Sequence, residues 1–88
     1  MRKIEKDINA IALLLATQAL INLGEIEDPV TKERRHNLDG AQVFIDLVGV
    51  LQQKTTGNLT AEEDGFLAEL KKNLDLIYEK RAGKGNRT

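Results

Sequence analysis

The chain has no cysteine, one histidine and only three aromatic residues among its 88 positions. Without cysteine it can form no disulfide, no thiolate metal site and no cysteine nucleophile. Because His36 is the single histidine, a metal site would need mostly carboxylate ligands. The aromatic residues Phe44, Phe66 and Tyr78 are too few for a base-stacking surface. A formal net charge of −1 gives no overall attraction to nucleic acid or to anionic membranes.

Long hydrophobic runs are also missing. The apolar segment Ala10 to Ala16 follows several cationic residues, as in a signal peptide, but Glu5 and Asp7 interrupt the positive region. No small-residue cleavage site follows the segment cleanly. Polar side chains interrupt it well before the ~18 apolar residues that a membrane span requires. We therefore expect a cytoplasmic protein in which this segment is a buried helix.

Apolar residues recur at helical spacing, which predicts an all-α domain with three helices. The length allows one domain, which we place at residues 1–82, followed by a flexible tail at 83–88. The expected helices cover about residues 4–23, 38–54 and 61–81.

The first helix is apolar on every side. Its expected core stripe is Ile4, Ile8, Ile11 and Leu15, but at about 100° per residue other large side chains surround the axis. Gly24 is a natural stop in the left-handed conformation. A helix of this kind has to be covered all round.

The second helix follows a polar connection in which Asp28 and Pro29 begin a turn. Asn37 or Asp39 is expected to cap it. One side carries large apolar residues at the spacing i, i+3, i+4 and i+7: Phe44, Leu47, Val48 and Leu51. The β-branched residues within 43–50 leave a strand as an alternative, although the helical period is the stronger one.

The third helix begins with a capping box, in which Thr60 and Glu63 satisfy each other's backbone N–H groups. Six apolar residues share one face: Phe66, Leu67, Leu70, Leu74, Ile77 and Tyr78. Leu76 falls on the opposite, charged side. Since residues 55–60 form a short connection, we expect the second and third helices to be an antiparallel hairpin.

Three short helices share one seam, so the apolar surface of the first helix exceeds what a monomer would cover. A symmetric homo-oligomer, most simply a dimer, would bury the excess. We assign the interface to six residues: Leu13, Leu14, Thr17, Gln18, Leu20 and Ile21. In the alternative, the first helix is the centre of a monomer and is sheltered by the long connection. Thr17, Gln18 and Asn22 would then line its polar edge.

Five segments of the chain resemble a known pattern: Leu15–Ile26 (LATQALINLGEI), Pro29–Thr31, Asn37–Ala41, Phe44–Val48 and Lys54–Glu63 (KTTGNLTAEE). Together they resemble a bacterial family of domains of unknown function, number eighteen-forty-four, over about residues 8–80. The chain departs from the family at Lys32, where glycine is usual, and at 75–80, where members have an arginine-rich segment. The resemblance implies a helical fold in bacterial cytosol and no activity.

Two cationic clusters suggest a weak polyanion contact at Arg34, Arg35, Lys80 and Arg81. Acidic neighbours nearly cancel the first cluster, and the second suits the end of a helix, so solvated surface is the simpler interpretation. No residue pattern indicates a catalytic, cofactor or metal site. The sequence therefore predicts a non-enzymatic structural or protein-interaction module. The alternatives are a small nucleic-acid-associated factor and an enzyme of unknown reaction.

Overall fold

The computed structural model describes residues 8–83. They form three α-helices, α1 (Ile8–Leu23), α2 (Leu38–Lys54) and α3 (Ala61–Ala82), and no strand occurs within this range. The all-α, three-helix prediction is confirmed, and the strand alternative for residues 43–50 is excluded. Of the expected tail at 83–88, Gly83 caps the end of α3 with a φ of 79°, while residues 84–88 and the expected first turn at 4–7 lie outside the described residues.

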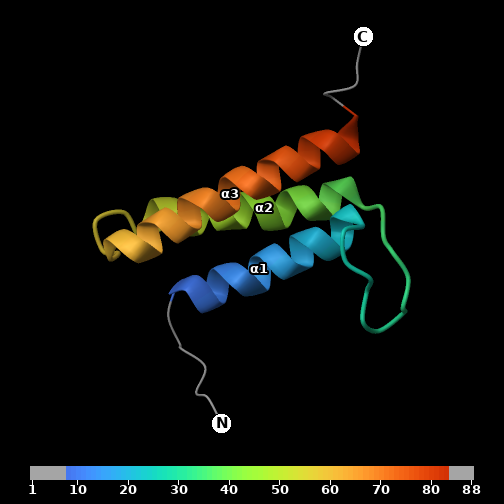
Figure 1. Ribbon diagram of the computed structural model, residues 1–88, viewed down its shortest axis with the longest axis horizontal. Coiled ribbons are helices and arrows are strands. Elements are labelled where there is room, and N and C mark those ends of the chain that lie inside the picture. Colours follow the sequence, from blue (N-terminus) through green and yellow to red (C-terminus); the bar gives the residue numbers. More distant parts are fainter. Residues whose placement is uncertain (1–7, 84–88) are drawn as a thin grey trace.

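Each helix packs against the other two. Figure 1 shows that α1 and α3 end on the side of the molecule where α2 begins. At that end the chain crosses from α1 to α2 through a loop at residues 24–37. The backbone N–H of Asn37 donates to the carbonyl of Asn22 at 2.9 Å, so the two ends of the loop are joined directly.

Local signals set the helix ends as expected. Gly24 has a φ of 85°, and the N–H groups of Gly24 and Glu25 donate to the carbonyls of Ile21 and Leu20. This pattern is a Schellman motif, which satisfies the last carbonyls of α1. At the start of α2, the side chain of Asn37 accepts from the N–H of Gly40 at 2.9 Å, so Asn37 and not Asp39 is the cap.

The capping box of α3 is present. Glu63 N–H donates to the Thr60 hydroxyl at 3.1 Å, and Thr60 N–H donates to the Glu63 carboxylate at 3.0 Å. Both bonds join residues three apart, which explains why the motif could be identified from the sequence.

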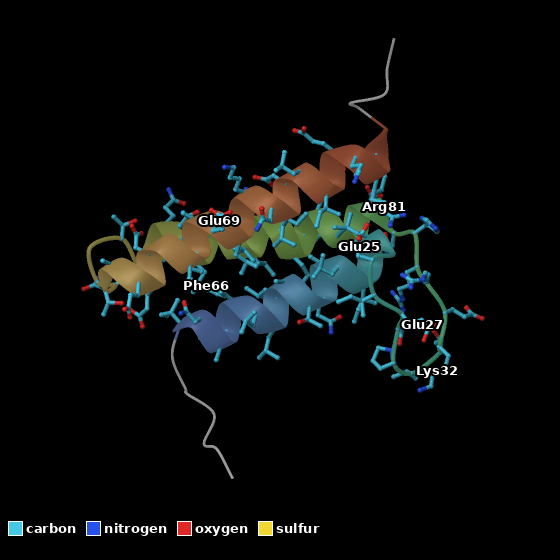
Figure 2. The ribbon with its side chains drawn as sticks, viewed as in Figure 1. Glu25, Glu27, Lys32, Phe66, Glu69 and Arg81 are labelled. Atoms are coloured by element: carbon cyan, nitrogen blue, oxygen red, sulfur yellow. The ribbon has the colours of Figure 1, made fainter. Side chains whose placement is uncertain are left out.

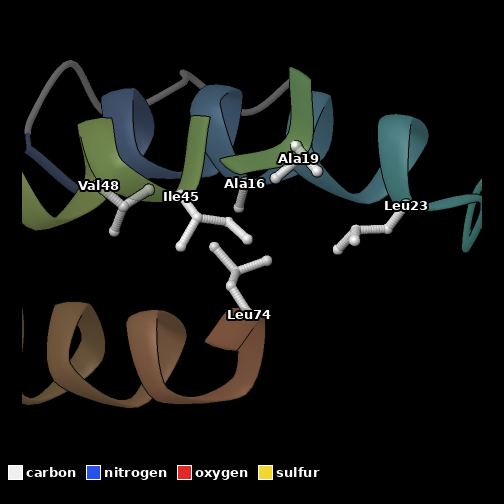
Figure 3. Packing of buried hydrophobic residues seen from close by; sticks show 7 residues of the cluster. Ala16, Ala19, Leu23, Ile45, Val48 and Leu74 are labelled. Carbon is white, nitrogen blue, oxygen red and sulfur yellow. The ribbon is translucent and has the colours of Figure 1, made fainter. Parts of the chain in front are cut away.

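The core is built on alanine in α1 and on larger side chains in α2 and α3. The buried cluster in Figure 3 contains Ala16, Ala19, Leu23, Ala41, Ile45, Val48 and Leu74. Ala12 is also buried, whereas Ile11 is 46% exposed. The prediction that Ile11 faces the core is therefore wrong. Ile45, Val48 and Leu74 fill the space in front of α1, and small side chains let the helices approach closely.

The expected faces of the other two helices are correct in part. On α3, Leu67 and Leu74 are fully buried and the other four residues are half-buried, while Leu76 is exposed as predicted. On α2, Val48 is buried, but Leu47 is 41% exposed and does not belong to the core.

Candidate functional site

The outer side of α1 is apolar and open. Leu14 is 71% exposed and Leu13 is 50% exposed, although both lie in the middle of the helix. From Ile8 to Leu23 the helix has no charged residue. The exposed Thr17 hydroxyl donates to the Leu13 carbonyl at 2.8 Å, so it needs no further partner. This side of α1 has the chemistry of an interface core, which is depleted in charge.

Helix α2 continues this surface. Its exposed row consists of Val43, Leu47 and Val50. Leu47 lies two helical turns after Gly40, and Ile11 lies three turns before Asn22, so each pair shares one side of its helix. A Cβ on Gly40 would lie 3.0 Å from the Asn22 side-chain oxygen, so these two sides face each other. Ile11 and Leu47 therefore flank the contact line between α1 and α2, Leu14 follows Ile11 by three residues on the outer side of α1, and Leu13 lies about 160° around that helix from Ile11. We call this surface the apolar face: Ile11, Leu13, Leu14, Val43, Leu47 and Val50.

The structure places the six expected interface residues in two groups. Leu13, Leu14, Thr17 and Gln18 are exposed. By contrast, Ile21 is 6% exposed and Leu20 packs against the core cluster, so both are covered within one protomer. Shelter of the first helix by the long connection was the alternative considered from the sequence. That end of α1 is therefore enclosed within one protomer, and the assignment of Ile21 to an interface is corrected.

Leu76 on α3 is a useful contrast. It is 56% exposed, close to the value for Leu13, but its neighbours along the outer side of α3 are charged. Lys72, Glu79 and Lys80 lie three or four residues away, at positions adjacent on a helix surface. A single exposed leucine among charges is ordinary solvated surface. The apolar face differs because its exposed residues adjoin one another.

The loop at 24–37 is organised around Asp28. Its carboxylate accepts from the N–H groups of Val30 at 2.8 Å and Thr31 at 3.3 Å, and pairs with the guanidinium of Arg35 at 3.2 Å. The pKa of Asp28 is lowered, chiefly because the Val30 N–H stabilises the ionised form, with Thr31 and Arg35 adding to the effect and partial burial opposing it.

Three of the four candidate polyanion residues have partners within the protein. Arg34 donates to the carbonyls of Gly24 and Glu25, and Arg35 contacts Asp28 and the buried Asn22. Arg81 pairs with the Glu25 carboxylate, 2.7 Å from its Nε (Figure 2). Lys80 is exposed. The structure therefore does not bring these four cations together as one surface, and it uses three of them to hold the loop against α1 and α3.

Lys32 has a φ of 63°, the left-handed conformation that favours glycine. At this position, where the sequence departs from the family pattern by having lysine in place of glycine, the backbone has a conformation that glycine adopts without strain. The strain lies beside the Asp28 cluster, since Lys32 N–H donates to the Asp28 carbonyl at 2.7 Å. The Asp-Pro-Val-Thr order is the signal that would have indicated the side-chain turn.

Over residues 8–83, no group of three histidine or acidic side chains is arranged to hold a metal ion. Within the same range, none of the helices combines the length and the apolar character needed to cross a membrane. The apolar face is therefore the candidate site that stands out from ordinary surface.

Comparison with known proteins gives one match. The family model described as "Domain of unknown function (DUF1844)" matches residues 5–80. No curated protein and no solved structure matches the chain.

Proposed function

The chain belongs to the DUF1844 family, and we propose that it acts as a non-enzymatic protein-interaction module that forms a homodimer through the apolar face. The observation that carries the proposal is the exposed apolar surface that α1 and α2 form together, uncharged on α1 and bordered on α2 by the exposed Asp46, whose carboxylate accepts from Gln42 at 2.8 Å. The proposal includes the antiparallel hairpin of α2 and α3 and a location in the bacterial cytoplasm, as expected from the sequence. The loop and α3 stay accessible to a protein partner in such a dimer.

The magnitude of the burial supports a dimer. The six residues of the apolar face are between 41% and 71% exposed, about half on average. Fully burying an aliphatic side chain contributes roughly 1.5–3 kcal/mol, so burying this face in both copies contributes on the order of 9–18 kcal/mol. Association itself costs about 4–15 kcal/mol. The balance is compatible with a dissociation constant near ~1 μM, which corresponds to about 8 kcal/mol.

The polar groups near the apolar face also favour its burial in a dimer. Thr17 is satisfied within α1, and the buried Asn22 donates to the Gln18 carbonyl at 2.8 Å. Burial of the face therefore leaves neither of these groups without a partner, which would otherwise cost about 1–3 kcal/mol. The Gln18 side chain is exposed and keeps its contact with water at the rim.

Sedimentation equilibrium of the unmodified chain and of two variants tests the proposal. Leu14→Asp places a charge in the centre of the apolar face, and Leu76→Asp makes the same change on the charged side of α3. Since both leucines are exposed in the protomer, both variants should keep their helix content by circular dichroism. We expect the unmodified chain and Leu76→Asp to be dimers and Leu14→Asp to be a monomer, because a buried unpaired charge is strongly unfavourable. A monomer mass for the unmodified chain at high micromolar concentration would refute the proposal.

A further inference from the structure

A two-fold axis places strict conditions on the apolar face. In a symmetric dimer each patch meets its own copy after a half turn, so full burial requires the axis to pass through the middle of the patch. The apolar face spans two helices, and its middle is therefore the line between α1 and α2. An axis that runs along that line within the interface places each α1 over α2 of the second copy, whereas an axis that crosses the line at a right angle places α1 over α1.

Leu14 and Leu47 lie at the same level on this line. Asn22 of α1 and Gly40 of α2 approach each other and serve as a common reference point. Leu14 precedes Asn22 by eight residues, and Leu47 follows Gly40 by seven residues. At 1.5 Å per residue these separations are about 12 Å and about 10 Å. Because α2 begins where α1 ends and returns along it (Figure 1), both steps lead in the same direction. Leu47 also has an exposed valine one turn away on each side, so it is the centre of its row.

An axis through α1 itself would give a poorer match. It would set Leu14 against Leu14 of the second copy and would place α2 over α3, since both helices contact α1. The outer side of α3 carries exposed charged residues: Glu69, Lys72, Glu79 and Lys80. The exposed row of α2 would then bury charge without partners, which is unfavourable.

We infer that, in the dimer of the proposed function, α1 of each copy packs on α2 of the other, with Leu14 against Leu47 of the second copy. This inference rests on the proposed function and adds which surfaces meet. In this arrangement α1 and α2 of both copies form a four-helix interface, and α3 of each copy lies on the side away from the interface.

Because the chain has no cysteine, single introduced thiols report this arrangement without background. Leu14→Cys and Leu47→Cys chains are prepared separately, mixed, oxidised, and analysed by mass spectrometry of the disulfide-linked peptides. A disulfide needs Cα atoms within about 7 Å, whereas two equivalent residues across this axis are separated by roughly the helix spacing of 8–10 Å. We expect the 14–47 disulfide to be roughly tenfold more abundant than the 14–14 or 47–47 disulfides.

The control mixture contains Leu14→Cys and Leu76→Cys and should give no selective disulfide, because Leu76 lies on the outer side of α3. Sedimentation of the unmodified chain and circular dichroism of each variant are recorded in parallel. A dominant 14–14 disulfide, or a dimer with no selective disulfide, overturns this inference and leaves the proposed function standing. A monomeric unmodified chain overturns the proposed function and this inference with it.

Discussion

Replacing Gly65 with alanine and replacing Gly40 with alanine make the same chemical change inside two helices, but their effects on stability should have opposite signs. Gly65 lies in α3, and a Cβ built on it meets no atom within 4 Å. Alanine there reduces the entropy of the unfolded chain and favours the helix. We expect Gly65→Ala to raise the free energy of unfolding by roughly 0.5–1 kcal/mol.

Alanine at position 40 would bring the same gain in helix propensity, but Gly40 lies against two side chains. Its Cβ would be 2.8 Å from the Asn37 amide nitrogen and 3.0 Å from the Asn22 oxygen. Asn37 caps α2 through the N–H of Gly40, and losing a cap costs about 0.5–2 kcal/mol. Displacing the buried Asn22 amide adds about 1–3 kcal/mol. After subtraction of the helix gain of roughly 0.5–1 kcal/mol, Gly40→Ala should lower the free energy of unfolding by roughly 0.5–4.5 kcal/mol.

Thermal and urea unfolding of the two variants beside the unmodified chain provide the assay, at one protein concentration because a dimer links stability to concentration. For a domain of this size, 1 kcal/mol moves the melting temperature by about 4–8 °C. The two variants should therefore melt on opposite sides of the unmodified chain. If Gly40→Ala is as stabilising as Gly65→Ala, the close approach of α1 and α2 at Asn22 is not present in solution.

Three further substitutions test the caps and the loop. Thr60→Ala removes the capping box and should lower the free energy of unfolding by about 0.5–2 kcal/mol in urea titrations, so an unchanged midpoint would show that the box contributes nothing. Lys32→Gly should raise the melting temperature slightly, because relief of about 1–2 kcal/mol of left-handed strain exceeds the roughly 0.4–1 kcal/mol of added chain entropy. For Asp28, whose pKa is lowered from 3.8, the stabilisation is present above that value and is lost as the pH falls through the lowered pKa. Acidification below about pH 4 should therefore lower the free energy of unfolding of the unmodified chain more than that of Asp28→Asn. Parallel curves of unfolding free energy against pH for the two proteins would contradict this.

The residues of the apolar face could be predicted from the sequence only in part. The surplus of large apolar residues around α1 indicated an interface, and Leu13, Leu14, Thr17 and Gln18 are on the surface. The row on α2 was not among the assigned interface residues, because Leu47 has the spacing of a core residue. Periodicity shows that residues share a side, but it does not show whether a neighbour covers that side.

Three helices and several of their ends could be predicted from the amino-acid order alone. The capping box at Thr60 and the stop at Gly24 are made by groups within a few residues of one another, so local order was sufficient, whereas the choice between Asn37 and Asp39 as the cap of α2 came from the structure.

Which side of α1 is buried depends on the packing of the other two helices and could not be predicted from local order. An uncharged helix has no polar face to orient it, so the choice depends on the volumes offered by its neighbours, and Ile45 and Leu74 leave room for Ala16 and Ala19. The same holds for the pair Glu25 and Arg81, which are 56 residues apart and meet because α1 and α3 end on the same side.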